Sequence, residues 1–97
     1  MTIQELTIEL DAIEKRTHLE KGYTFQYDPV TIKEGRKYDK INIGTSGAWM
    51  IERETGEIFN IKGFGVPDKN KKAKADIGNL DTVDPEEMHK LRYNYLR

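Results

Sequence analysis

A three-residue polar link, Glu54-Thr55-Gly56, constrains the fold of this chain more than any other sequence feature. It joins two apolar-rich segments, residues 48–53 and 57–62. Because Gly56 can adopt the positive φ that a short link often needs, this pattern predicts a β-hairpin. A third alternating segment at residues 38–43 precedes the hairpin, after a break at Gly44-Thr45-Ser46-Gly47. Residues 38–62 are therefore predicted to form a three-stranded antiparallel meander at the centre of a sheet.

The first twenty residues have the pattern of an amphipathic helix. Thr2 and Glu5 have the spacing of a capping box, in which each side chain satisfies an exposed amide at the helix start. Apolar residues then follow at helical spacing, which predicts a helix over residues 3–20 that extends through Leu19 and stops at Gly22. The members of that stripe are Ile3, Leu6, Leu10 and Ile13.

A second helix is predicted over residues 85–95. Asp84 is a preferred N-cap residue, and Pro85 fits the first helical position because its missing N–H is not needed there. Met88, Leu91 and Tyr95 continue at helical spacing.

These segments predict an α+β fold in a single domain over residues 1–97, with both helices on one face of the sheet. The sheet region spans residues 23–64 and contains three to five antiparallel strands. Its first strands are an aromatic one at residues 23–27 and a short one at 30–33. A polar, Lys-rich loop is predicted over residues 65–83, since this stretch shows no regular period.

Composition limits the classes of function. The 97 residues carry a formal net charge of −1, so the chain is not a polycation that coats nucleic acid. No cysteine is present, which excludes disulfides, thiolate metal sites and cysteine nucleophiles. No apolar run approaches the roughly 18 residues of a membrane span. We therefore expect a cytoplasmic protein that does not bind membranes.

No catalytic constellation is evident in the sequence. Ser46 lacks the spacing of a nucleophile elbow and is interpreted as a turn residue. His18 and His89 lie on the predicted helices without a metal-binding pattern, so we expect both at the surface or at helix ends. The acidic residues between 76 and 87 do not have the spacing of a calcium loop. The sequence therefore predicts no enzyme activity, no cofactor and no metal site.

The most unusual feature is a lysine-rich segment at residues 62–74, which follows an aromatic strand edge. Lysines beside aromatic rings suit contacts to phosphates and bases, but such a segment also suits a protein-binding surface or a solvated connector. The acidic face of the first helix is a further candidate surface for a basic partner. The candidate binding residues for a partner or a phosphate are Lys62, Phe64, Lys69, Lys71, Lys72 and Lys74.

One part of the chain resembles a group of small proteins encoded by tailed bacteriophages. The resemblance covers roughly residues 37–80. It rests on the Thr-Gly-acidic-Ile-aromatic hairpin at residues 55–59, a following Lys- and Pro-containing segment, and Gly78-Asn79. It implies a phage or prophage origin and action inside a host bacterial cell, and it implies no particular activity.

We therefore expect a small, non-enzymatic binding protein, most simply an inhibitor or modulator of a host defence protein. The alternative is a nucleic-acid or nucleotide binder that uses the lysine-rich segment and the neighbouring aromatic residues. The sequence leaves the oligomeric state open.

Overall fold

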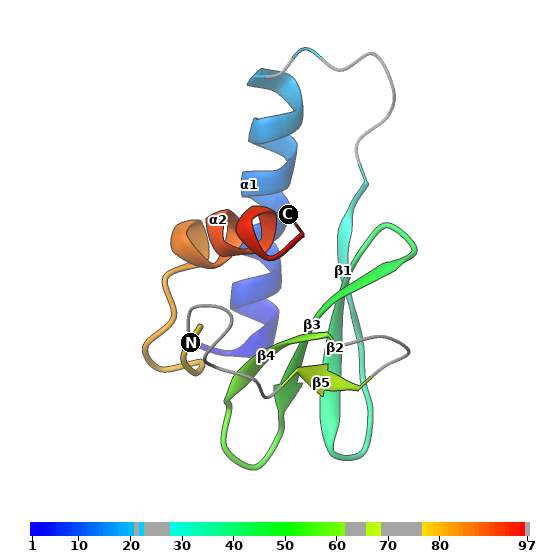
Figure 1. The fold of residues 1–97 in the computed structure, drawn as a ribbon, viewed down its shortest axis with the longest axis vertical. Helices are drawn as coiled ribbons and strands as arrows, with labels where there is room; N and C mark the ends of the chain where they lie inside the picture. The colour runs from blue at the N-terminus through cyan, green and yellow to red at the C-terminus, as the bar shows by residue number, and fades with distance from the viewer. Residues whose placement is uncertain (21, 23–27, 62–65, 69–76, 97) are drawn as a thin grey trace.

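The fold of the chain is α+β, as predicted (Figure 1). The computed structural model describes residues 1–20, 22, 28–61, 66–68 and 77–96. The predicted aromatic strand at residues 23–27 lies outside these ranges. In chain order the elements are α1 (Ile3–Glu20), β1 (Val30–Lys33), β2 (Tyr38–Ile43), β3 (Ser46–Glu52), β4 (Ile58–Ile61), β5 (Pro67–Asp68) and α2 (Pro85–Leu96).

The strands form an antiparallel meander in the order β1-β2-β3-β4-β5. The predicted break between β2 and β3 is shorter than expected, since Ser46 and Gly47 already belong to β3 and pair with β2. A register shift between Ile41 and Asn42 accommodates the extra residue in β3. The two-residue strand β5 lies within the segment predicted as a loop and pairs with β4 at the sheet edge.

The hairpin between β3 and β4 has the predicted link. Gly56 has a φ of 75°, and its N–H donates to the Glu52 carbonyl at 2.7 Å. A later segment then pairs with this hairpin: Ile58 N–H donates to the Gly78 carbonyl, and Leu80 N–H donates to the Gly56 carbonyl, both at 2.9 Å. The chain that leads into α2 is thereby held against the central hairpin.

Both helices pack on the same face of the sheet, as predicted. Trp49 is fully buried, with Ile41 as its cross-strand neighbour on β2. Leu10 from α1 and Met88 from α2 belong to the same hydrophobic cluster. The full cluster of buried residues is Leu6, Leu10, Val30, Ile41, Ala48, Trp49, Ile51, Ile58 and Met88.

The first helix begins with the predicted capping box. Thr2 N–H donates to Glu5 Oε1 at 3.0 Å, and Glu5 N–H donates to Thr2 Oγ1 at 3.1 Å. Its predicted apolar stripe is buried or half-buried, but Leu19 is 71% exposed. The helix extends through Leu19 to Glu20, as expected. Leu19 nevertheless lies outside the buried stripe, because six residues beyond Ile13 correspond to about 120° around the helix.

The capping box makes a testable prediction about pH. The N–H of Thr2, and secondly its side chain, hold the pKa of the Glu5 carboxyl below its ordinary value. A lowered folded-state pKa means that the cap stabilises the fold at pH values above the unfolded pKa. That contribution is lost as the pH falls through the folded pKa.

Titration of the Glu5 carboxyl by NMR should therefore give a lower midpoint in the folded chain than in the urea-unfolded chain. In Thr2→Pro, which lacks both the N–H and the hydroxyl, the folded midpoint should rise toward the unfolded value. Equal midpoints in the folded and unfolded wild-type chain would contradict the assignment.

Neither helix in the described part of the chain combines the length and apolar character that a membrane crossing requires.

Candidate functional site

The six binding residues predicted from the lysine-rich segment lie outside the described residues. The structure therefore neither brings together nor separates Lys62, Phe64, Lys69, Lys71, Lys72 and Lys74. Within the described ranges, the candidate site lies instead where the start of α2 meets the middle of α1.

An ion pair holds the start of α2 against α1. Arg16 Nη2 on α1 donates to both carboxylate oxygens of Glu86 on α2, at 2.8 and 2.9 Å. The Glu86 carboxylate raises the pKa of the Arg16 guanidinium, first through this hydrogen bond and then through its charge. Both carboxylate oxygens accept from the single nitrogen Nη2, and both side chains are about half-exposed.

A second contact lies one turn further along α2 and corrects a prediction. His89 was expected at the surface or at a helix end, but it is 6% exposed, and its Nε2 lies 2.6 Å from Glu14 Oε2 on α1. No sequence pattern indicates this pair, because the two residues are 75 positions apart. Arg16–Glu86 and Glu14–His89 together attach α2 to α1 at two successive turns.

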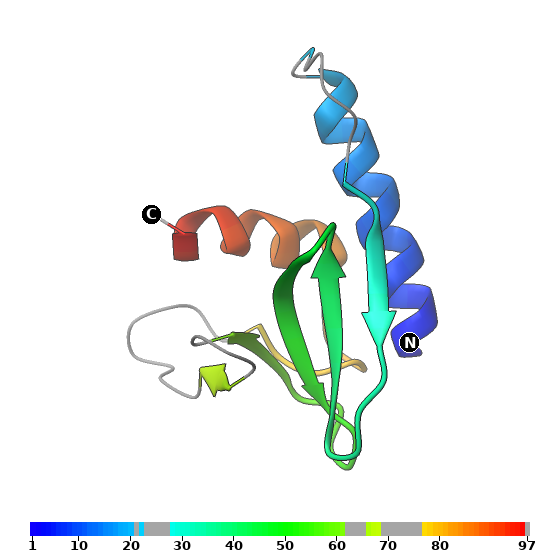
Figure 2. The ribbon, with the colours of Figure 1, turned by 90° about the vertical axis from the view of Figure 1, so that its right-hand side faces the viewer.

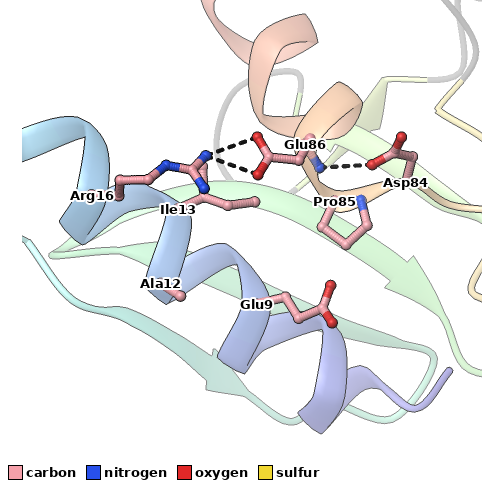
Figure 3. A pocket seen from close by; sticks show the side chains of 7 residues that line it. All are labelled: Glu9, Ala12, Ile13, Arg16, Asp84, Pro85 and Glu86. Atoms are coloured by element: carbon pink, nitrogen blue, oxygen red, sulfur yellow. Dashed lines mark hydrogen bonds and ion pairs between the residues drawn. The ribbon is translucent and has the colours of Figure 1, made fainter. Parts of the chain in front are cut away.

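A groove opens beside the Arg16–Glu86 pair (Figure 3). Its volume is about 260 Å³, and α1 forms one wall while the start of α2 forms the other. Ala12, Ile13 and Pro85 supply its apolar surface, and Arg16–Glu86 bridges the two walls. The lining residues are Glu9, Ala12, Ile13, Arg16, Asp84, Pro85 and Glu86.

The groove carries net negative charge, because Glu9, Asp84 and Glu86 outnumber the single cation Arg16. Glu86 is already paired, and Asp84 Oδ1 accepts the Glu86 N–H at 3.0 Å as the predicted N-cap of α2. The Glu9 carboxylate makes no hydrogen bond or ion pair within the described part of the chain, and it lies at the edge of the apolar surface (Figure 3). Glu9 is therefore the carboxylate best placed to receive a cation from outside.

The apolar surface and the Glu9 carboxylate together favour contact with a lysine or arginine side chain. Lysine and arginine side chains have apolar stems that cover hydrophobic surface while their charged ends remain solvated or paired. A stem can lie on Ala12, Ile13 and Pro85 while its cationic end approaches Glu9. The sequence showed the acidic face of the first helix and the acidic start of the second separately, but not that the fold joins them across an apolar floor.

Among the residues that the structure describes, no group of three or more His, Asp or Glu side chains is arranged to hold a metal ion. No protein-family model, curated protein or solved structure that we compared is significantly similar to the chain.

Proposed function

We propose that this chain is a non-enzymatic protein-binding module whose α1–α2 groove receives a basic segment of its partner. The observation that carries the proposal is an apolar floor bordered by carboxylates between two attached helices. Because the two inter-helix contacts fix both walls, little ordering is needed on binding, which favours affinity. The partner is a protein with a lysine- or arginine-bearing segment exposed on its surface.

The resemblance to tailed-phage proteins suggests where the chain acts. We propose that it is phage-encoded, that it works in the cytoplasm of a host bacterium, and that it inhibits or modulates a host protein, such as a defence protein. A basic surface on that host protein is the target that the groove would cover.

Capture from a bacterial lysate tests this function, with a matched pair of charge reversals. Glu9→Lys places a cation at the groove, whereas Glu54→Lys makes the same change on the exposed link between β3 and β4. Both substitutions are at exposed positions, where the effect on the free energy of unfolding is usually within about 0.5 kcal/mol.

We expect Glu9→Lys to weaken partner binding at least about tenfold, equivalent to about 1.4 kcal/mol, and Glu54→Lys to bind as wild type does. Wild-type binding should also weaken as salt is added, mainly through a slower association rate. Unchanged binding by Glu9→Lys would exclude the groove as the contact surface.

The same experiment separates the alternative function. A variant with Lys69, Lys71, Lys72 and Lys74 changed to alanine should retain the partner, and nuclease treatment of the lysate should leave the capture unchanged. If the quadruple variant fails to capture the partner and nuclease treatment also abolishes capture by wild type, the proposal of a protein partner is contradicted. That result would instead favour nucleic-acid binding by the lysine-rich segment, whose phosphate contacts give a steep salt dependence.

A further inference from the structure

The face of the sheet that points away from the helices carries a pair of lysines on its first two strands. Lys33 on β1 and Lys40 on β2 are direct cross-strand partners, so both side chains lie on one face. Ile41, the residue after Lys40, is buried in the core, and successive side chains of a strand alternate between faces. The lysines therefore lie on the outer face. Figure 2 looks onto this face, with β1 and β2 in front of α1.

This lysine pair has no counterion within the described part of the chain. Neither Lys33 nor Lys40 forms an ion pair there, although Lys33 is exposed and Lys40 is half-buried. Like charges placed directly opposite each other on two strands repel and destabilise a sheet. An anion that binds both ammonium groups would remove this repulsion.

Two uncharged polar side chains adjoin the lysine pair. Asn42 lies two residues after Lys40 and so faces the same way, and its cross-strand partner Thr31 is exposed. A Cβ at Gly47 would come within 3.2 Å of Lys40 Cδ and 3.7 Å of Asn42 Oδ1. The lack of a side chain at Gly47 therefore leaves room for the Lys40 stem beside the Asn42 amide. Hydroxyl and amide groups are common donors to phosphate oxygens.

An aromatic ring and a further cation lie next along β2. Tyr38 is half-buried, and its ring meets Phe59 edge-on, with the ring centroids 6.3 Å apart. Lys37 Nζ lies 5.6 Å from the centroid of the Tyr38 ring. On the described strands, Glu52 is the only carboxylate that the register places on this face, and its Oε1 accepts the Thr55 hydroxyl at 3.0 Å. The outer face is therefore cationic, whereas the α1–α2 groove is acidic.

We propose that this outer face of the sheet, defined by Lys33, Lys37, Tyr38, Lys40 and Asn42, binds single-stranded nucleic acid. The lysines contact phosphates and release the counterions of the strand, while a base stacks on the exposed part of the Tyr38 ring. Strands β1 to β4 contain lysine but no arginine, so this face lacks the bidentate side chain that most often reads a base edge. Binding therefore shows little sequence preference.

The ring beside the lysines favours a single strand over other anions. The bases of a duplex are stacked on one another, so a duplex offers this face its phosphates alone. A single strand can place a base on Tyr38 and its phosphates at Lys37 and Lys40. An acidic peptide matches the charge but brings no base to the ring. Because the α1–α2 groove lies on the other side of the sheet, this site is additional to the groove.

Fluorescence anisotropy with a labelled oligothymidylate of about 15 nucleotides tests the site on the full chain. For three phosphate contacts on a single strand, the logarithm of the association constant should fall with the logarithm of salt concentration with a slope of about −2. Lys33→Ala and Lys40→Ala should each reduce the magnitude of that slope by about 0.7. At about 50 mM salt, the double variant should bind at least about tenfold more weakly than wild type. Lys90→Ala is the matched control, because it removes an exposed lysine from α2 and should bind as wild type does.

Replacement of Tyr38 separates stacking from charge. Tyr38→Leu should weaken binding by about fivefold or more, because the base loses the ring on which it stacks. The salt slope should stay at the wild-type value, since no phosphate contact is removed. Circular dichroism of each variant confirms that the fold is retained.

An oligothymidylate that does not bind the wild-type chain would overturn the proposal. So would one that binds the double lysine variant with the wild-type affinity and slope. Equal binding of a duplex of the same length, or of polyglutamate, which presents charge without bases, would also contradict the assignment to a single strand.

Discussion

Replacement of Trp49 by alanine should lower the free energy of unfolding by about 3–5 kcal/mol, the range typical for deletion of a buried large aromatic side chain. Trp49 has no exposed surface and lies on β3 between its neighbours Ile41 on β2 and Asn60 on β4. The helices and the central strands share the cluster that contains it. The cavity left by the indole would therefore loosen both layers of the fold.

Chemical denaturation followed by circular dichroism measures this loss. Ile8→Ala is the matched control, because it also truncates an apolar side chain but at an exposed site, so its midpoint should stay close to that of wild type. The denaturation midpoint of Trp49→Phe should lie between those of Trp49→Ala and Ile8→Ala. This variant keeps the loss of stability measurable if Trp49→Ala is largely unfolded. An unchanged midpoint in Trp49→Ala would show that Trp49 is not at the centre of the core.

Replacement of His89 by alanine should cost roughly 1–3 kcal/mol, because it leaves the half-buried Glu14 carboxylate without its partner on α2. Glu14→Gln is the milder change, since the amide can still form a hydrogen bond with the ring of His89. Thermal or urea unfolding of both single variants and of the double variant gives the interaction free energy between the two residues. Independent, additive effects would contradict a contact between them.

The elements that the sequence predicted best are those whose signals are local. The capping box joins residues three apart, and the stripe of α1 repeats within one helix. The β3–β4 hairpin likewise depends on a link whose glycine takes a positive φ. Each of these features can be evaluated without knowing where the rest of the chain lies.

The features that the sequence did not predict depend on distant partners. His89 is buried because α2 crosses α1 where Glu14 lies. The groove exists because Pro85 meets Ala12 and Ile13 across that same crossing. The roles of these side chains depend on the packing of the two helices against each other. Neither composition nor periodicity therefore indicates these roles.

A photo-crosslinking residue at position 12 tests whether the α1–α2 groove binds the partner, because Ala12 lines that groove. The control carries the same residue at position 31, since Thr31 is exposed on β1 outside the groove. We predict that the captured partner crosslinks to position 12 and not to position 31, through a peptide that contains lysine or arginine. Crosslinking to position 31 with none at position 12 would contradict it.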